Sequence, residues 1–411
     1  MKRVVITGLG VISPVGNTVE AFWDALINGR CGIDFITKFD TTDFKVKIAA
    51  EVKGFDPHDY MEKGEIRKTD LFAQYAIAAA AQAIEDSAIL GTVEPERLGV
   101  YVGSGIGGMN TFINECDKYL KGGPRKVSPL FVPMMIANMA AGNIAIKYNA
   151  QGPSLPVVTA CATSTNAVGE AFRSIRYGYA DAIIVGGAEA TVNPLAIAGF
   201  TNCMALSTKN IPEESSLPFD KRRDGFVMGE GAGILILEEY GHAKARGAKI
   251  YAEISGYGNT CDAHHITAPH PEAVGGARAI SLAVEEAELQ DETELYINAH
   301  GTGTPLNDKS ETLAIKKALG DKAYQVSISS TKSMTGHMLG AAGAIEAIAS
   351  VLTLERGMIP PTIGYLEKDE NCDLDYVPNT ARKKKVNAAL SVSLGFGGHN
   401  ACIALRKYRG E

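Results

Sequence analysis

The sequence contains no C-x-x-C cysteine pair, no long basic run and no apolar stretch long enough to span a membrane. Its seven cysteines are scattered and odd in number, which argues against a zinc site and a disulfide framework and favours a reducing cytoplasm. A formal net charge of −7 argues against general binding to nucleic acid. The opening residues enter a strand pattern at once and carry no secretory signal. We therefore expect a cytoplasmic protein that binds neither nucleic acid nor membranes.

No short internal repeat is visible either, which excludes a solenoid. Glycine, in contrast, is abundant, and the 44 glycines cluster at strand ends and turns, as in α/β proteins. Helical and strand patterns alternate, which predicts α/β layers. The polar stretch Asp369–Lys385 is interpreted as a surface excursion. The expected helices are Thr18–Asn28, Thr69–Ser87 and Ala162–Tyr177. The expected strands are Val4–Thr7, Leu98–Val102, Pro156–Ala160, Ala182–Val185, Gly233–Leu237, Ala252–Gly256, Leu295–Ala299, Val326–Ser329 and Ala388–Val392.

Two parts of the chain are similar to each other. The strand pattern Val157–Cys161, followed by a small-residue helix, has a counterpart in Val326–Lys332, followed by another small-residue helix. This similarity predicts a duplicated fold, with an N-terminal half at residues 1–250 and a C-terminal half at residues 251–411. Packing of the two halves would bring loops of the second over the cysteine of the first.

Cys161 has the most informative surroundings in the chain. The β-branched run Val157–Ala160 predicts a buried strand, and the small residues after Cys161 predict the start of a helix. The cysteine then lies on a strand-to-helix turn, where the positive end of the helix dipole would lower the pKa of its thiol. Taken alone, a cysteine of this kind is more often a buried structural residue. The other motifs of the chain favour a nucleophile.

Three further glycine-rich segments carry candidate catalytic groups. His300 directly follows an apolar strand, where α/β proteins often place such groups. Lys332 and His337 surround a turn that enters a small-residue helix, and Gly395–Asn400 offers backbone N–H groups for an oxyanion hole. A thiolate and two neutral imidazoles suit thioester chemistry, because the thiolate accepts an acyl group and the imidazoles stabilise an enolate oxygen. His399 stays open between a site role and a supporting role, and the other histidines are interpreted as structural or surface residues: His58, His242, His264, His265 and His270.

Together these motifs resemble the β-ketoacyl-acyl-carrier-protein synthases, and Pro218–Gly233 is similar to the same family. The resemblance covers essentially the whole chain, and the surroundings of Cys161 and the opening Val4–Gly16 are most similar to the bacterial synthase II group. It implies a thiolase-type fold, in which duplicated α/β halves form a five-layered α/β/α/β/α arrangement, and a homodimer. It also implies a condensing enzyme of fatty-acid biosynthesis that needs no cofactor and no metal, because the phosphopantetheine arm of acyl carrier protein carries its substrates.

The resemblance implies a ping-pong reaction and a role for each candidate residue. The acyl chain would move from its carrier protein to Cys161. Malonyl-carrier protein would then lose CO₂, and its enolate would attack the acyl-cysteine to give 3-oxoacyl-carrier protein. His300 and His337 would stabilise the enolate, and Lys332, paired with Glu346, would order the histidine region. A purely structural ion pair between these last two residues fits the pattern equally well.

Four other residues receive roles from the same resemblance. The amides of Cys161 and Phe396 would form the oxyanion hole, and Phe396 would also act as a gate that responds to acylation. Thr302 and Thr304 would contact the phosphopantetheine arm, and Ile106 would line the acyl pocket. Two residues differ from the family's usual pattern and leave gate kinetics and chain-length preference open: Val392 in place of an asparagine and Gly303 in place of a frequent serine.

Acyl carrier protein is strongly acidic, so an acidic synthase needs a local basic patch to bind it. Arg67 and Lys68 form one basic cluster, and Lys121, Arg125 and Lys126 form another. Ordinary solvated surface charge explains both clusters equally well.

Three alternative functions remain. Gly103–Gly108 satisfies G-x-G-x-x-G after a strand, as in a dehydrogenase, but the acidic ribose partner expected about 20 residues on is missing. A non-catalytic assembly partner would retain the fold and lose the chemistry, and the intact Cys161, His300 and His337 argue against it. A synthase I-type enzyme would differ in chain-length or unsaturated-chain preference and not in mechanism.

Overall fold

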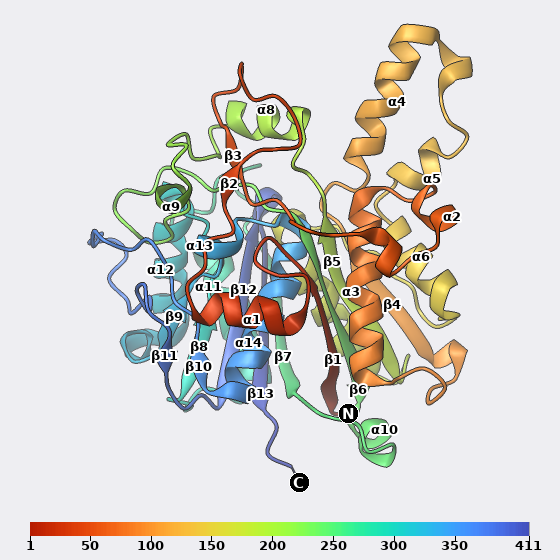
Figure 1. Cartoon of the computed structure of the whole chain (residues 1–411). Coiled ribbons are helices and arrows are strands. Elements are labelled where there is room, and N and C mark those ends of the chain that lie inside the picture. Colours follow the sequence, from red (N-terminus) through yellow and green to blue (C-terminus); the bar gives the residue numbers. More distant parts are fainter. Residues whose placement is uncertain (411) are drawn as a thin grey trace.

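The computed structural model describes residues 1–410 and centres on a mixed sheet of nine strands, in the order β4-β5-β6-β1-β7-β13-β12-β8-β9 (Figure 1). In the N-terminal half β4 and β5 are parallel, and β6 and β1 continue the sheet antiparallel. In the C-terminal half β9, β8 and β12 are parallel, and β13 and β7 continue it antiparallel. Pairing of β1 with β7 joins the halves. The nine strands are β1 Val4–Ile12, β4 Leu98–Gly103, β5 Ala182–Glu189, β6 Gly231–Glu239, β7 Ala252–Cys261, β8 Leu295–Asn298, β9 Ser327–Ser329, β12 Ala388–Gly395 and β13 His399–Lys407.

Helices form three layers around the two halves of the sheet. The first layer, α3 and α6, covers the outer face of the N-terminal half, and α7 and α14 lie between the halves. The third layer is α11, backed by α12. These contacts confirm the five-layered α/β/α/β/α arrangement and the duplication. The helices are α1 Val19–Ile27, α2 Lys63–Ile66, α3 Leu71–Ser87, α4 Met109–Gly122, α5 Phe131–Met135, α6 Met139–Tyr148, α7 Thr163–Arg176, α8 Pro194–Asn202, α9 Pro212–Ser215, α10 Tyr240–Ala245, α11 Val274–Glu286, α12 Pro305–Leu319, α13 Lys332–Thr335 and α14 Ala342–Arg356; the short two-stranded pairs are β2 Asp34–Phe35 with β3 Ile48–Ala49, and β10 Met358–Ile359 with β11 Arg382–Lys383.

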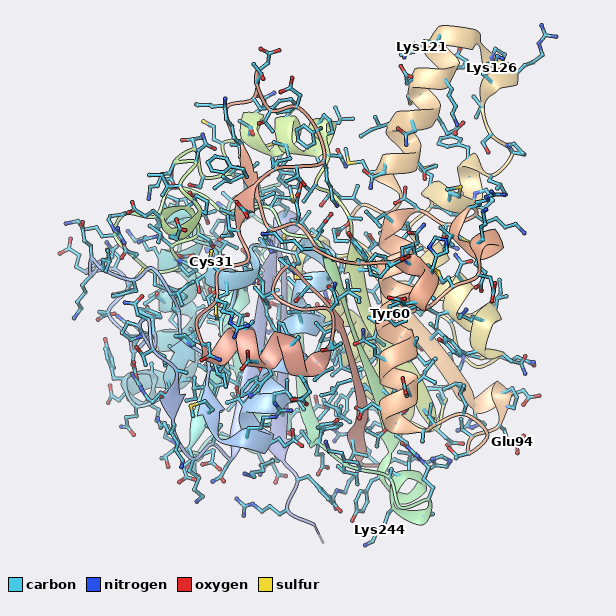
Figure 2. All side chains as sticks on the ribbon, viewed as in Figure 1. Cys31, Tyr60, Glu94, Lys121, Lys126 and Lys244 are labelled. Carbon is cyan, nitrogen blue, oxygen red and sulfur yellow. The ribbon has the colours of Figure 1, made fainter. Side chains whose placement is uncertain are left out.

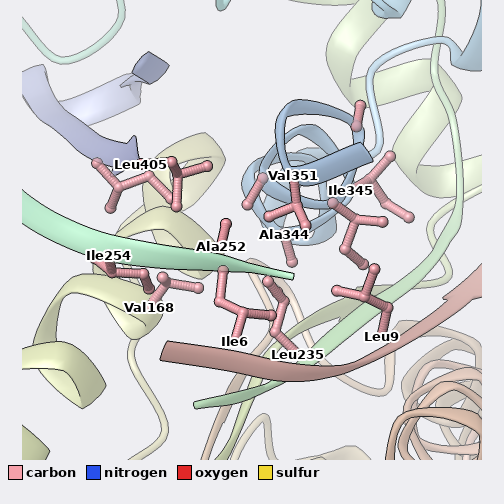
Figure 3. Close-up of a cluster of buried hydrophobic side chains, with 14 of the residues drawn as sticks. Ile6, Leu9, Val168, Leu235, Ala252, Ile254, Ala344, Ile345, Val351 and Leu405 are labelled. Atoms are coloured by element: carbon pink, nitrogen blue, oxygen red, sulfur yellow. The ribbon is translucent and has the colours of Figure 1, made fainter. Parts of the chain in front are cut away.

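The central helical layer is held by a buried apolar cluster that both halves share. Figure 3 shows Ala344, Ile345 and Val351 of α14 near side chains of strands from both halves, including Leu9 of β1 and Ala252 of β7. Burial of a large aliphatic side chain of this kind contributes about 1.5–3 kcal/mol. The cluster therefore fixes α14 against strands of both halves of the sheet.

The N-terminal ends of α7 and α14 touch each other in this central layer. The Ala344 N–H donates to Ser164 Oγ at 2.9 Å. A Cβ added to Gly343 would lie 1.9 Å from Thr165 Oγ1, so only glycine permits this approach. Because Cys161 precedes α7 and His337 precedes α14, this contact brings the two candidate groups together.

The strand expected at Pro156–Ala160 is not formed, and that prediction is wrong. The chain runs along the outer edge of β4, where the Val100 N–H donates to the Pro153 carbonyl and the Leu155 N–H to the Val100 carbonyl, but this gives one isolated bridge. Pro153 and Pro156 have no N–H to donate. Within residues 1–410 the segment also has no strand on its other side. It occupies the edge position that β9 holds in the other half.

The remaining expected strands and all three expected helices are present, with bounds that differ by a few residues. Strand β13 was not expected from the sequence. Asp369–Lys385 is only partly a surface excursion, because Cys372 and Val377 are fully buried and the Tyr376 ring stacks on Phe219 with centroids 4.0 Å apart.

No helix within residues 1–410 is long and apolar enough to span a membrane. The boundary at residue 250 stays a prediction.

Candidate active site

Cys161 lies in a single 3₁₀ turn, Ala160–Ala162, that leads directly into α7. The residue before it, Ala160, has a φ of 50°, in the left-handed region that residues other than glycine rarely adopt. Gly395 approaches this turn closely, since a Cβ there would lie 3.3 Å from the Cys161 nitrogen. The turn is therefore strained and tightly packed, as is common where a nucleophile is presented.

The structure brings both candidate histidines to this cysteine. Cys161 Sγ and a ring nitrogen each of His300 and His337 all lie within 4.8 Å of one another. The two imidazole rings are nearly perpendicular, at 87°, with centroids 5.3 Å apart. His300 follows β8 and His337 follows α13, so residues distant in sequence form one cluster.

The hydrogen bonds that hold the two histidines come from their backbone N–H groups. The His300 N–H donates to Glu311 Oε1 at 2.6 Å, and the His337 N–H donates to the Val227 carbonyl at 2.7 Å. The edge of His337 contacts the Phe226 ring, with centroids 5.1 Å apart. Among described residues, Nδ1 of His300 and both ring nitrogens of His337 have no hydrogen-bond partner. These nitrogens therefore keep hydrogen-bonding capacity that the described residues do not use.

Burial keeps both imidazoles neutral. It lowers the pKa of His300 and of His337 well below the ordinary value, and the nearby Lys332 charge acts in the same direction. Since a neutral imidazole carries one N–H, each ring can donate a hydrogen bond to an oxygen. The lowered pKa keeps this form present as the pH falls below 6.5, the ordinary value.

Lys332 and Glu346 form a buried ion pair beside the histidines. Both side chains are almost fully buried, and burial raises the pKa of Glu346 while the Lys332 charge opposes it. Glu346 Oε2 has no hydrogen-bond partner among described residues. Removal of one partner would leave a buried unpaired charge, which makes the pair costly to break.

A cavity of about 350 Å³ opens over the cluster. Its walls include Phe200, Phe226 and Leu394, which make it largely apolar. The sequence-predicted residues that line it are Cys161, His300, Thr302, Thr304, His337 and Phe396. The cavity thus joins the candidate nucleophile to the candidate arm-binding threonines, whose hydroxyls lie 3.0 Å apart.

Phe396 lies beside Cys161 in the cavity wall. Its backbone N–H acts to lower the pKa of the cysteine thiol, and its ring packs near Phe200, with centroids 6.4 Å apart. Val392, the departure noted above, is buried in the apolar cluster of the C-terminal half. The other departure, Gly303, has a φ of 80°, which favours glycine over serine.

The remaining predicted residues lie outside the cavity. Ile106 does not line it, and its side chain is 40% exposed. Arg67, Lys68, Arg125 and Lys126 are exposed on the surface. Figure 2 shows Lys121 and Lys126 at the tip of the projection that α4 begins.

Burial overturns the expectation that the resting thiol has a lowered pKa. Burial raises the pKa of Cys161 to about 11, although the Lys332 charge and the Phe396 N–H oppose this rise. The N-terminus of α7 acts in the same direction as those two groups. The neutral thiol is therefore the stable form of the unliganded site.

We expect the rate of Cys161 alkylation by iodoacetamide to rise about 100-fold between pH 7 and pH 9. The reason is that the thiolate fraction increases about tenfold per pH unit while the pH stays below the raised pKa. The measurement is peptide mass spectrometry of the alkylated site, with Cys161→Ala as the blank. A rate that is already constant from pH 7 would show that α7 and Lys332 outweigh burial.

The glycine-rich loop Gly103–Gly108 is filled by a side chain of the protein itself. The Ser104 hydroxyl and the N–H groups of Gly105 and Ile106 all donate to the buried Glu189 carboxylate. These donors are unavailable to a phosphate, so the dehydrogenase hypothesis is wrong.

Three buried carboxylates near the site were missed at the level of sequence. Glu189 fills the loop after β4, Glu311 accepts the N–H groups of His300 and Gly301, and Asp308 accepts that of Gly303. Burial raises the pKa of Glu311 to about 8. In the sequence, Asp308 is indistinguishable from the acidic residues that commonly stabilise the start of a helix, and Glu311 from an ordinary charged residue within a helix.

Comparisons with known proteins agree with this geometry. Residues 1–243 match the family described as "Beta-ketoacyl synthase, N-terminal domain", and residues 251–366 match "Beta-ketoacyl synthase, C-terminal domain". The chain therefore belongs to the β-ketoacyl synthases, the condensing acyltransferases of fatty-acid biosynthesis, and has their thiolase-type fold.

The similar proteins are matched over their full length. The chain is 51% identical over 410 residues to the 3-oxoacyl-[acyl-carrier-protein] synthase 2 of Synechocystis sp., covering 99% of both chains. It is 50% identical over 408 residues to the protein of that name from Staphylococcus aureus, again covering 99% of both. A solved β-ketoacyl synthase from Burkholderia phymatum has a TM-score of 0.92 and 35% identity, covering all of both chains. A ketosynthase solved in complex with its type II PKS acyl-carrier protein has a TM-score of 0.91 and 36% identity, covering 99% of this chain and 100% of the other.

Proposed function

We propose that this protein elongates fatty acids. It condenses an acyl chain carried on acyl carrier protein with the malonyl group of malonyl-carrier protein, through an acyl intermediate on Cys161. The observation that supports this proposal most directly is the convergence of Cys161 Sγ with two neutral histidines in one cavity. The products are 3-oxoacyl-carrier protein, CO₂ and free carrier protein.

In the first step the sulfur of Cys161 attacks the acyl thioester carbonyl. The thiol proton leaves with the departing sulfur of the carrier's phosphopantetheine arm, which becomes a free thiol. The N–H groups of Cys161 and Phe396 stabilise the oxyanion, and the position of both residues in the wall of the cavity supports this placement. Phe396, whose ring lines the cavity, acts as the gate.

In the second step malonyl-carrier protein binds and loses CO₂. The bond to the carboxylate breaks, and its electron pair forms an enolate whose oxygen accepts hydrogen bonds from His300 and His337. The enolate carbon attacks the acyl carbonyl on Cys161 and releases the sulfur as a thiolate, which takes up a proton. Lys332, paired with Glu346, orders the histidine region and keeps both rings neutral through its charge.

The chemistry needs no cofactor and no metal beyond these side chains, because the substrates arrive as activated thioesters. Thr302 and Thr304 contact the phosphopantetheine arm from the wall of the cavity. The protein acts in the cytoplasm, where carrier proteins occur, and binds neither nucleic acid nor membranes.

We further propose that the protein forms a homodimer through the edge of β4. Leu155 and Val158, in the segment that fails to form a strand, are 45% and 53% exposed. Unpaired edge segments with exposed apolar side chains commonly pair with a second chain. Ile106 is also exposed, and its proposed contact with the acyl chain requires that the second copy cover it.

The function is tested by incubating the protein with acyl-carrier proteins of several chain lengths and malonyl-carrier protein. We expect 3-oxoacyl-carrier protein two carbons longer, with an equal amount of CO₂, measured by intact mass and gas release. Saturated and unsaturated donors in parallel distinguish a synthase II from a synthase I range. Absence of product with every donor would leave the non-catalytic assembly partner as the better assignment.

Exposed basic residues provide the proposed docking surface for the acidic carrier. Arg67→Glu with Lys68→Glu should raise the KM for acyl-carrier protein about tenfold and leave kcat within about twofold, because the pair lies outside the cavity. The same reversal at Arg125 and Lys126 tests the second cluster. Lys317→Glu with Lys383→Glu, at two exposed positions of the C-terminal half, serves as the charge-matched control. An unchanged KM would remove the altered cluster from the docking surface.

A further inference from the structure

Glu189 is a completely buried carboxylate at the end of β5 that the proposed mechanism does not use. It accepts four hydrogen bonds. Oε1 accepts from the Ser104 hydroxyl at 3.0 Å and the Ile106 N–H at 3.2 Å. Oε2 accepts from the N–H groups of Gly105 and Gly340, both at 2.9 Å. Within residues 1–410 no salt bridge reaches it, so these hydrogen bonds alone compensate its burial.

The four donors belong to separate parts of the chain. Ser104, Gly105 and Ile106 form the loop after β4 in the N-terminal half, whereas Gly340 begins the approach to α14 in the C-terminal half. Gly340 stands three residues after His337. One carboxylate therefore links a loop of the first half to the histidine segment of the second.

The same packing reaches the turn that holds the nucleophile. A Cβ on Gly105 would lie 2.7 Å from Glu189 Oε2 and 3.7 Å from the carbonyl oxygen of Ala160, the residue before Cys161. A Cβ on Gly340 would lie 2.4 Å from the Gly105 nitrogen. Glycine at both positions permits a close approach that any side chain would prevent.

Both segments beside this carboxylate contain strained backbone. Ala160 has a φ of 50° and Leu339, directly before Gly340, has a φ of 46°. Left-handed conformations at residues other than glycine cost of order 1 kcal/mol each and persist only where surrounding contacts impose them. The hydrogen bond from Gly340 to Glu189 is such a contact, because it fixes the peptide that follows Leu339.

We propose that Glu189 is a positioning residue for the condensation step: its carboxylate clamps the loop after β4 to Gly340 and thereby sets the Cys161 turn at its working distance from His337. The inference rests on the proposed roles of Cys161 and His337. Burial raises the pKa of Glu189 to about 7 against the opposing effect of its four donors, which agrees with a carboxylate retained for its hydrogen bonds.

Glu189→Gln tests the clamp at nearly constant volume. An amide offers one acceptor oxygen and one N–H₂ group, so the donors that face the N–H₂ group lose their acceptor. Condensation needs Cys161 and His337 together, whereas acylation of Cys161 and decarboxylation of malonyl-carrier protein each depend chiefly on one of them. We expect kcat for condensation to fall about 100-fold and each partial reaction to fall less than about fivefold.

Two further variants make the result decisive. Glu189→Asp keeps the negative charge but has a shorter side chain. Its ratio of the condensation rate to the partial-reaction rates should therefore lie between the ratio of the wild type and that of Glu189→Gln. This variant also provides the test if Glu189→Gln does not fold. Glu238→Gln is the control for loss of a buried carboxylate, because Glu238, on β6, is equally buried and pairs with Arg246, which follows α10. It should lower Tm without changing the ratio.

Either of two outcomes for Glu189→Gln would overturn the proposal. In the first, the rates of condensation, acylation and decarboxylation all fall by one common factor, as they would if a smaller fraction of the protein were folded. In the second, none of these rates changes. The wild-type partial reactions, measured in the same preparation, test the proposed function separately. Their absence would remove that function and with it the role of Glu189.

Discussion

Cys161→Ala should carry no acyl group after mixing with any acyl-carrier protein, and its condensation rate should fall at least about 10⁴-fold. Intact-protein mass gives the first result directly, because the wild type gains the mass of the acyl group and loses the thiol hydrogen. The physical reason is that the structure places no other thiol beside the two histidines within residues 1–410. Chain lengths that acylate the wild type also map the donor range.

Cys203→Ala is the matched control for this experiment. Cys203 lines the same cavity as Cys161 but is exposed, and it is not part of the cysteine–histidine cluster. The control should acylate and condense at wild-type rates. An acyl adduct on Cys161→Ala, or its loss on Cys203→Ala, would contradict the assignment of the nucleophile.

His337→Ala should slow decarboxylation of malonyl-carrier protein about 10²–10³-fold, the usual cost of one lost hydrogen-bond donor to a developing oxyanion. Acylation of Cys161 should stay within about threefold, because the oxyanion of that step is held by backbone N–H groups. The two rates are measured by CO₂ release and by intact mass. Loss of the buried ring also removes its contact with Phe226, so folding is checked by Tm.

His264→Ala controls for the loss of a histidine. His264 is exposed and does not line the cavity. Its removal should leave both rates unchanged. Equal losses of acylation and decarboxylation in His337→Ala would show that the residue supports the whole site, and not the enolate in particular.

Local sequence predicted the parts of this protein that depend on neighbouring residues. The small residues after Cys161 begin a helix, and His300 follows a buried strand, as expected. The similarity between the surroundings of Cys161 and of Lys332 predicted the duplication that the sheet order confirms. These features are local because hydrophobic periodicity and turn residues act over a few positions.

Local pattern was misleading where the partner of a segment decides its structure. The run at Pro156–Ala160 has the composition of a strand, but a strand needs a neighbour on at least one side, and the edge of β4 supplies only one bridge. The Gly103–Gly108 loop has the spacing of a phosphate-binding turn, but Glu189 occupies its donors. Neither outcome is visible without the elements that pack there.

The sequence by itself determined the α/β class, the duplication and the three residues most suited to thioester chemistry: Cys161, His300 and His337. Tertiary structure decided their electrostatics, because desolvation depends on every group packed around a side chain. It raised the pKa of the Cys161 thiol where the helix alone would lower it, and kept both histidines neutral. It also recruited Glu189, since burial of that carboxylate required donors from segments that are distant in sequence and meet only in the folded chain.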